Sequence, residues 1–254
     1  MNHELTLTKT NRLRLAEAFR HNRRVDYSID CAVEGQMGRA YVDHPERPTA
    51  WCINVGPFWY FAGVAGGPGG RALLAEFPPH NLLMPSPPEW IGAAREMFGD
   101  RLVTFPRYSF DAESLSEVHL NAILDTSPHR EHVRRVDTGL LARPDNYVEY
   151  DDFDSAEDFL DRGIAYTMLE GGTLAGAAYS SLVCNRGIEV SLFVDEPYRR
   201  RGIATALSAA LLLECVRRGL RPNWDAGNLA SCALAEKLGY TPTGVYKSYY
   251  YSNE

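Results

Sequence analysis

The chain has few cysteines, and none of them has the spacing of a paired site. Its five cysteines are scattered over 254 residues, and no Cys-x-x-Cys pair occurs. An odd and dispersed set argues against both a disulfide framework and a zinc knuckle. The histidines also show no pairing with metal-ligand spacing. We therefore expect no metal.

Long apolar runs and an excess of positive charge are missing as well. No run approaches the roughly 18 to 20 apolar residues that a membrane helix requires, and the first residues do not resemble a secretory signal. Asp and Glu number 33 against 26 Lys and Arg, which gives a formal net charge of −7. This balance argues against nonspecific nucleic-acid binding. We expect a cytoplasmic protein with no membrane or nucleic-acid partner, and the sequence leaves a homodimer open.

The length and composition suit a globular protein with one large or two modest domains. Hydrophobic residues make up 45% of the chain and charged residues 23%, which is ordinary for such proteins. The pattern of elements changes near residues 126–128, so we predict an N-terminal α/β domain over residues 1–128 and a second domain over 129–254. The first half carries no motif with a chemical interpretation. Its glycine cluster, Gly66 to Gly70, lacks a following lysine and predicts a simple turn.

Hydrophobic periodicity and turn residues predict the elements of both halves. In the first half we expect helices over residues 11–22, 88–98 and 115–124, and strands over 39–43, 50–55, 59–64 and 102–105. In the second half we expect strands over 133–141, 164–169, 173–183, 188–194, 221–224 and 244–251, with helices over 156–162, 205–218 and 228–238. The fold class is therefore a mixed α/β sheet.

The most informative stretch lies between the strand at 188–194 and the helix at 205–218. A strand that turns through Gly202 into a helix leaves the first helix amides without partners, and these amides favour phosphate oxygens. The run Arg199-Arg200-Arg201 adds positive charge, and small Ala204 keeps the helix mouth open. Neither a Walker loop nor a Gly-x-Gly-x-x-Gly fingerprint is present. The stretch predicts a pyrophosphate site, and a solvated basic turn is the alternative.

Two segments in order make the prediction specific. The pattern Arg199-x-x-Gly202-x-Ala204 resembles the acetyl-CoA signature of the GCN5-related N-acetyltransferases. Downstream, Asn228-x-x-Ser231 followed by Leu-Ala-Glu-Lys-Leu-Gly-Tyr at 234–240 is similar to their second signature. The resemblance covers roughly residues 133–251. It implies a C-terminal acetyltransferase fold with a mixed, mostly antiparallel sheet flanked by helices. The smaller first domain is interpreted as a degenerate copy of the same fold.

The resemblance also implies where acetyl-CoA binds. Backbone amides at the turn would hold the diphosphate, and strand amides would meet the pantetheine arm and the acetyl oxygen. Asn228 would hydrogen-bond the arm, with Ser231 beside it. The expected cofactor-binding set is Phe193, Val194, Arg199, Arg200, Arg201, Gly202, Ile203, Ala204, Thr205, Asn228 and Ser231.

The catalytic assignments follow from the same resemblance. Glu189 is the expected general base, although it lies ten positions before Arg199 where the common spacing is one greater, so a bulge must absorb the difference. The alternatives are a solvent-facing glutamate and a mechanism without a dedicated base. The family's usual acid, a tyrosine seven positions after the asparagine, is Ala235 here. Tyr240 is the candidate that replaces it, with Tyr246 and Cys232 also nearby in sequence.

The leading functional hypothesis is an N-acetyltransferase that moves an acetyl group from acetyl-CoA to a primary amine of a small molecule. Asp225 and Tyr246 are the candidate contacts to that amine. The first alternative is a noncatalytic acyl-CoA-binding module that regulates a partner. A different reaction on the same scaffold, such as aminoacyl transfer, is a third hypothesis, which the acidic composition and the intact diphosphate signature disfavour.

Overall fold

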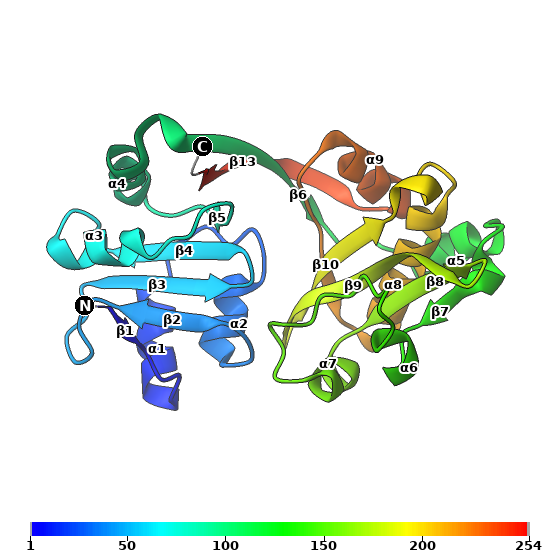
Figure 1. Cartoon of the computed structure of the whole chain (residues 1–254), viewed down its shortest axis with the longest axis horizontal. Helices are drawn as coiled ribbons and strands as arrows, with labels where there is room; N and C mark the ends of the chain where they lie inside the picture. The colour runs from blue at the N-terminus through cyan, green and yellow to red at the C-terminus, as the bar shows by residue number, and fades with distance from the viewer. Residues whose placement is uncertain (1, 253–254) are drawn as a thin grey trace. The chain divides into compact units, whose positions relative to one another are not determined.

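The structure, a computed structural model, describes residues 2–252 and divides into two compact units. Unit 1 consists of Met1–Arg107 together with Val245–Glu254, and unit 2 consists of Tyr108–Gly244. Two long strands, β6 (Leu102–Asp111) and β13 (Thr241–Tyr251), contain the points where the chain passes between the units (Figure 1). The predicted boundary between residues 128 and 129 differs from this division, because the last strand returns to the sheet of unit 1.

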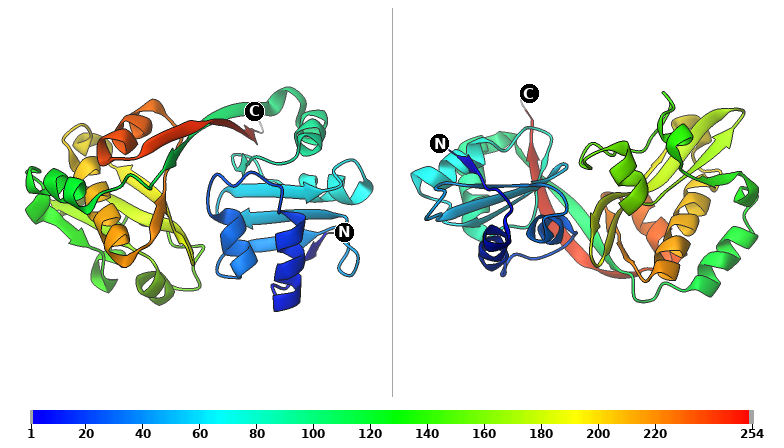
Figure 2. Two further views of the ribbon diagram at one scale, coloured as in Figure 1. Left: turned by 180° about the vertical axis from the view of Figure 1, so that it is seen from behind. Right: turned by 90° about the horizontal axis from the view of Figure 1, so that it is seen from below.

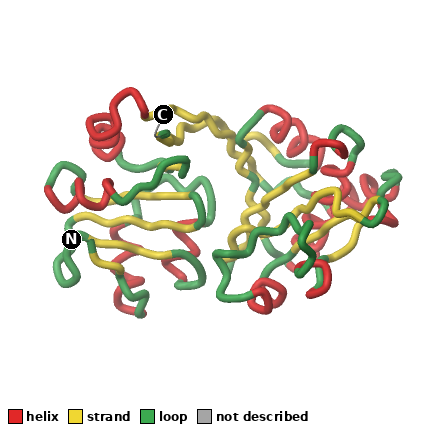
Figure 3. The backbone as a smooth tube through the Cα atoms, in the orientation of Figure 1, coloured by secondary structure: helices red, strands yellow, loops and turns green. Residues whose placement is uncertain are grey.

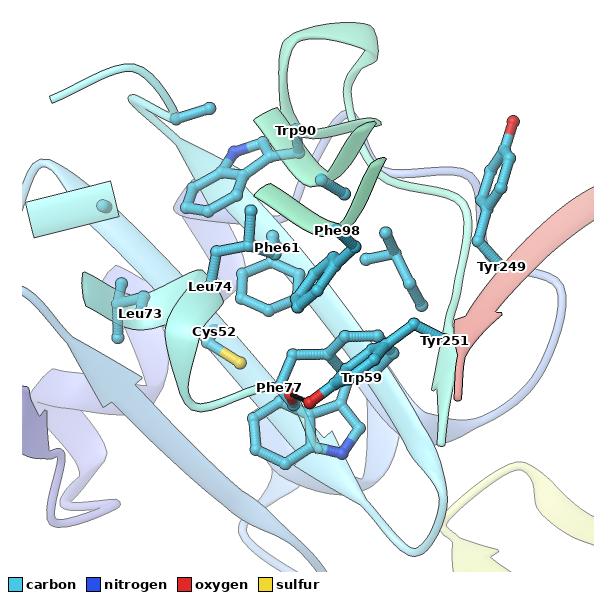
Figure 4. Close-up of a cluster of buried hydrophobic side chains, with 14 residues drawn as sticks. Cys52, Trp59, Phe61, Leu73, Leu74, Phe77, Trp90, Phe98, Tyr249 and Tyr251 are labelled. Atoms are coloured by element: carbon cyan, nitrogen blue, oxygen red, sulfur yellow. Dashed lines mark hydrogen bonds between the residues drawn. The ribbon is translucent and has the colours of Figure 1, made fainter. Parts of the chain in front are cut away.

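Unit 1 is a sheet with helices on both faces. In chain order it contains β1 (His3–Glu4), α1 (Lys9–Ala18), α2 (Ser28–Glu34), β2 (Arg39–Val42), β3 (Ala50–Val55), β4 (Phe58–Gly63), α3 (Pro68–Ala75), β5 (Leu82–Leu83), α4 (Pro88–Phe98) and a 3-10 turn at Gly99–Arg101. The strand order is β1-β2-β3-β4-β5-β13, with β4 and β5 paired in parallel, and the sheet continues from β13 to β6 and β12 (Asp225–Ala226). Figure 3 shows the strands in yellow and the helices in red. Aromatic rings of β4, α4 and β13, among them Phe61, Trp90 and Tyr251, fill the core under α3 and α4 (Figure 4).

Unit 2 has the same plan. It contains α5 (Glu117–Asp125), a 3-10 turn at Arg130–His132, β7 (Val133–Arg135), α6 (Thr138–Leu141), α7 (Ala156–Arg162), β8 (Ala165–Glu170), β9 (Thr173–Cys184), β10 (Gly187–Val194), a 3-10 turn at Glu196–Tyr198, α8 (Ile203–Arg218), β11 (Arg221–Asn223), β12 (Asp225–Ala226) and α9 (Leu229–Leu238). Its sheet has the order β7-β8-β9-β10-β11, in which only β10 and β11 are parallel. The apolar side chains of α5, α8 and α9 form its core.

The two units repeat one topology. In each, an antiparallel meander (β2-β3-β4 or β8-β9-β10) leads through a helix (α3 or α8) to a parallel strand (β5 or β11) (Figures 1 and 2). A strand followed by a crossover helix and a parallel neighbour is a compact unit that recurs in mixed sheets. This agreement favours the prediction that the first half is a second copy of the same fold.

Two local predictions are wrong. The predicted strand over residues 133–141 is β7 followed by helix α6, because the Asp137 side chain accepts a hydrogen bond of 2.8 Å from the Leu140 amide and caps that helix. The glycine cluster is not a simple turn, since α3 begins inside it at Pro68. A Cβ on Gly70 would lie 2.3 Å from the Val64 carbonyl oxygen, so the helix start requires glycine for close packing.

Candidate functional site

The turn from β10 into α8 presents an uncapped helix N-terminus. Gly202, the N-cap residue, has φ +85° and ψ 0°, and no side chain caps the helix. The first backbone bond of the helix runs from the Ala206 amide to the Gly202 carbonyl oxygen over 3.1 Å. The amides of Ile203, Ala204 and Thr205 precede it and have no acceptor within the helix. These donors, with the positive end of a 16-residue helix, form a place suited to an anion.

The three arginines of the turn are used differently. The Arg199 side chain donates from Nε to the Val194 carbonyl oxygen at 2.9 Å, which ties the turn to the end of β10. Arg201 pairs with the Glu170 carboxylate of β8. Arg200 is exposed and has φ +61°, an uncommon value for a residue other than glycine. Arg200 and Gly202 are therefore the two left-handed residues of the turn. The side chains of Arg199 and Arg201 hold the turn against β10 and β8.

A histidine outside the signature holds the same turn. His129 Nε2 lies 2.6 Å from the carbonyl oxygen of Arg201, so the Nε2–H tautomer donates to this carbonyl. The His129 ring also lies 3.8 Å from where a Cβ on Gly202 would be placed. This contact could not be predicted from local sequence patterns, because it joins residues 72 positions apart.

The strand that leads into the turn has an open edge. β11 pairs with β10 only over Gly187 to Glu189, so no strand pairs with the outer edge of residues 190–194 among the described residues. On its other edge β10 pairs with β9 along its whole length, with a register shift between Glu189 and Val190. An unpaired strand edge presents alternate N–H and C=O groups for hydrogen bonding. Phe193 and Val194 belong to this open edge.

Glu189 lies where the open edge begins. It is the last residue of β10 that pairs with β11, opposite Asn223. Only 4% of its surface is exposed, and both carboxylate oxygens accept from Asn223 Nδ2, at 3.0 and 2.9 Å. The expected bulge thus occurs at this residue, and the glutamate is buried and hydrogen-bonded instead of facing solvent.

A pocket of about 390 Å³ adjoins the open edge. Strand residues Ser191, Leu192 and Phe193 form one side, and the loop between α6 and α7 forms the other. The lining residues are Asn146, Tyr147, Val148, Glu149, Tyr179, Ser191, Leu192 and Phe193. The Tyr147 ring packs on Phe193 with centroids 4.6 Å apart, so the loop and the strand are in direct contact. The pocket combines aromatic surface with one carboxylate, Glu149.

The tyrosines of this pocket are neutral donors at physiological pH. Burial, together with the nearby charge of Glu149, raises the pKa of Tyr179 to about 12. Partial burial also raises the pKa of Tyr147, with a second contribution from the charge of Asp195. A phenol whose pKa lies above its ordinary value keeps its proton and can donate a hydrogen bond. The sequence analysis did not predict a site at Tyr147, Glu149 and Tyr179. The signal present in the sequence is the aromatic and acidic run Tyr-Val-Glu-Tyr at 147–150.

The second predicted segment forms the start of α9. Asn228 caps this helix, and its Oδ1 accepts from the Ser231 amide at 2.9 Å, which leaves its amino group as the donor available to a ligand. The Ser231 hydroxyl accepts from the Trp224 indole at 3.1 Å. Asp225 is half-buried in β12, opposite Ser109 of β6.

The structure disfavours the predicted replacements for the missing acid. The Tyr240 ring is buried between Phe110 and Trp224, and its hydroxyl donates to the Pro222 carbonyl oxygen at 3.1 Å. Tyr246 belongs to unit 1, where Arg23 stacks on its ring, while the acetyl-CoA signature belongs to unit 2. Cys232 is a buried core residue whose pKa is raised by burial. The Tyr240 hydroxyl is therefore engaged by the Pro222 carbonyl oxygen and the Tyr246 ring is covered by Arg23. The catalytic role of Tyr240 and the substrate contact of Tyr246 stay predictions.

Within residues 2–252, no group of three or more His, Cys, Asp or Glu side chains is arranged to hold a metal ion. No helix in the same range combines the length and the apolar character needed to cross a membrane. All five cysteines are free and buried.

Comparisons with known proteins give one consistent family. The model of the GNAT acetyltransferase family matches residues 20–249. The uncharacterized N-acetyltransferase YdfB of Bacillus subtilis is 23% identical over 228 residues, which are 84% of this chain and 85% of YdfB. A crystal structure of a GCN5-related N-acetyltransferase-like protein from Streptococcus suis is 28% identical with a TM-score of 0.82, and the match covers 96% of this chain and 99% of that one. A tandem GNAT protein from the clavulanic acid biosynthesis pathway shares the fold, with 16% identity, a TM-score of 0.58 and coverage of 98% and 96%.

Proposed function

This chain belongs to the GNAT acetyltransferase family, and on that premise we propose that it moves an acetyl group from acetyl-CoA to a primary amine of a small molecule. Acyl transfer from an acyl-CoA is the family's reaction. The choice of acetyl, the small amine and the residues named below are our proposal. The observation that carries it is the continuity of the open edge of β10 with the uncapped start of α8.

The open edge and the helix start suit the two ends of the donor. The amides at Arg200 to Thr205 would hold the diphosphate, because unpaired helix N–H groups and the helix dipole favour negative charge. The pantetheine arm carries amides that can pair with β10 along residues 190–194, in the way that a strand adds to a sheet edge. Asn228 would donate its amino group to the arm from the start of α9. The acetyl oxygen would accept from an amide near Phe193 or Val194.

The reaction needs an amine without its proton, a polarised carbonyl and a leaving thiolate. The amine nitrogen attacks the thioester carbon while a C–N bond forms, and the C–S bond then breaks. The amine proton passes to Glu189, directly or through water, and the thiolate takes a proton from solvent. The Glu189 carboxylate is buried where the open edge begins and is positioned by Asn223, which suits it to accept this proton. We assign the final acid to solvent because Ala235 has no proton to donate and the Tyr240 hydroxyl already donates to the Pro222 carbonyl oxygen.

The pocket beside the open edge would hold the acceptor. Its carboxylate, Glu149, favours a protonated amine, and the rings of Tyr147 and Phe193 favour an apolar body. A volume of about 390 Å³ suits a small metabolite better than a protein segment. A basic substrate also agrees with the negative net charge of the chain.

The experiment compares thiol release from acetyl-CoA across a panel of small amines for the wild type, Glu189→Gln and Glu236→Gln. Glutamine at 189 can still accept from Asn223 but cannot take a proton, so we expect a fall in kcat/KM of about 10²-fold or more near neutral pH. Glu236 is exposed on α9, and its variant is the control for the same charge change. Tight acetyl-CoA binding with no thiol release on any amine would instead support the noncatalytic regulatory module.

A further inference from the structure

Unit 1 contains a cavity of about 460 Å³ that the proposed acyl transfer does not use. It lies at the edge of the sheet near β1, between the strands and helix α3. The lining residues are Asn2, Glu4, Tyr41, Cys52, Trp59, Leu73 and Glu76, all of unit 1. Its volume lies in the range of small-molecule pockets.

The cavity results from one small residue among large ones on a single face of the sheet. Tyr41 pairs with Cys52 across β2 and β3, and Cys52 pairs with Phe61 across β3 and β4. Trp59 lies two residues before Phe61 and so shares this face. Cysteine is far shorter than its aromatic neighbours, so a space remains above Cys52 beside the rings of Tyr41 and Trp59. Figure 4 shows Cys52 and Trp59 on this face, with Leu73 on the covering helix.

The aromatic wall consists of two stacked rings. The rings of Tyr41 and Trp59 are almost parallel, with centroids 6.5 Å apart and an interplanar angle of 4°. The Trp59 indole N–H donates to Asn81 Oδ1 at 3.2 Å, which fixes the ring by its edge. The faces of such rings carry partial negative charge and attract cations, most strongly for tryptophan.

The charged groups that line the cavity are acidic. Glu4 and Glu76 are carboxylates on its rim, and no lining residue carries positive charge. Asn2 donates from Nδ2 to the Ala72 carbonyl oxygen at 2.8 Å and to Glu76 at 3.5 Å. Its Oδ1 is buried and has no hydrogen-bond partner among the described residues. Burial holds the pKa of Cys52 well above its ordinary value, so its thiol adds no charge.

We infer that this cavity binds a small protonated amine with an apolar body. The ammonium N–H groups would donate to the Glu76 carboxylate, and the apolar body would lie against Tyr41 and Trp59. A quaternary ammonium has no N–H group to donate to Glu76, and an anion would be repelled by the carboxylates of Glu4 and Glu76. Glu4 is less available, because the exposed Arg39 lies 3.9 Å from it.

The test follows the indole N–H signal of Trp59 by NMR in the whole chain, assigned by its loss in Trp59→Phe. The probes are 2-phenylethylamine, protonated at pH 7, and its neutral isostere 2-phenylethanol. We expect a saturable shift with the amine and at least tenfold weaker binding of the alcohol. Glu76→Gln should weaken amine binding at least fivefold, whereas Glu46→Gln, an exposed change in the same unit, should leave it unchanged.

Three results would overturn the inference: no shift at millimolar amine, equal binding of amine and alcohol, or unchanged affinity in Glu76→Gln. A dispersed spectrum in each variant shows that the fold is retained. The result is independent of the proposed acetyl transfer, because the signal reports on Trp59 of unit 1 and the acceptor pocket belongs to unit 2. If 2-phenylethylamine binds only beside Glu149 of unit 2, the Trp59 signal will not shift. That result counts against binding in this cavity.

Discussion

Replacing Gly202 by alanine should weaken acetyl-CoA binding far more than it destabilises the fold. Gly202 has φ +85°, a left-handed conformation that costs a residue with a Cβ about 1–2 kcal/mol. The new Cβ would meet His129 Cδ2 at 3.8 Å, an ordinary contact, so the space itself adds no penalty. The turn can relieve the strain by changing φ, and the amides of Ile203 to Thr205 then move away from the diphosphate.

The other end of the same helix provides a matched control. Gly219, the C-cap residue of α8, has φ +69°, and a Cβ there would meet nothing within 4 Å. Gly219→Ala should therefore carry the same backbone cost of about 1–2 kcal/mol with no effect on the donor site. Both variants should shift the urea midpoint by similar amounts. Only Gly202→Ala should raise the Kd for acetyl-CoA, by tenfold or more.

The assay is calorimetry with acetyl-CoA, combined with urea unfolding of both variants. Unchanged affinity in Gly202→Ala would refute the assignment of the diphosphate to this turn. An equal loss of affinity in Gly219→Ala would show that the effect is general destabilisation and would refute the reasoning in the same way.

Two further predictions concern contacts that stabilise unit 2. Tyr240→Phe removes the hydrogen bond to the Pro222 carbonyl oxygen and should cost about 1–2 kcal/mol in urea unfolding with kcat unchanged; a tenfold fall in kcat would support Tyr240 as the acid. The pKa of Asp145 is lowered to about 2, first by its hydrogen bond from Arg143 and then by the one from the Leu174 amide. The ionised carboxylate therefore stabilises the fold above its unfolded pKa near 4, and this contribution is lost as the pH falls toward 2. The stability difference between wild type and Asp145→Asn should therefore be constant above about pH 5 and disappear near pH 2, and a difference that persists there would contradict the assignment.

Local patterns predicted much of unit 2. The meander of β8, β9 and β10 follows from apolar runs separated by glycine turns, and α8 follows from the stretch after Gly202. The signature turn was predictable because its chemistry is contained in neighbouring residues. The same reasoning predicted β2, β3, β4 and α4 of unit 1, where the periodicity is strong.

Long-range pairing explains what the sequence did not predict. Tyr249 of β13 pairs with Leu83 of β5, which brings the last strand into unit 1 and moves Tyr246 with it. The contact of His129 with Arg201 and the pocket beside Phe193 also join distant segments. Helix α3 was missed because glycine and proline obscured its start, although proline at the first helical position is favourable.

The most direct test of the account measures the backbone amides of residues 190–194 and 203–205 by NMR as acetyl-CoA is added. The account predicts saturable shifts and slower hydrogen exchange at both segments together, since one ligand would bond to the strand edge and to the helix start. Saturable binding of acetyl-CoA that leaves these amides unchanged, or no binding at all, would contradict it.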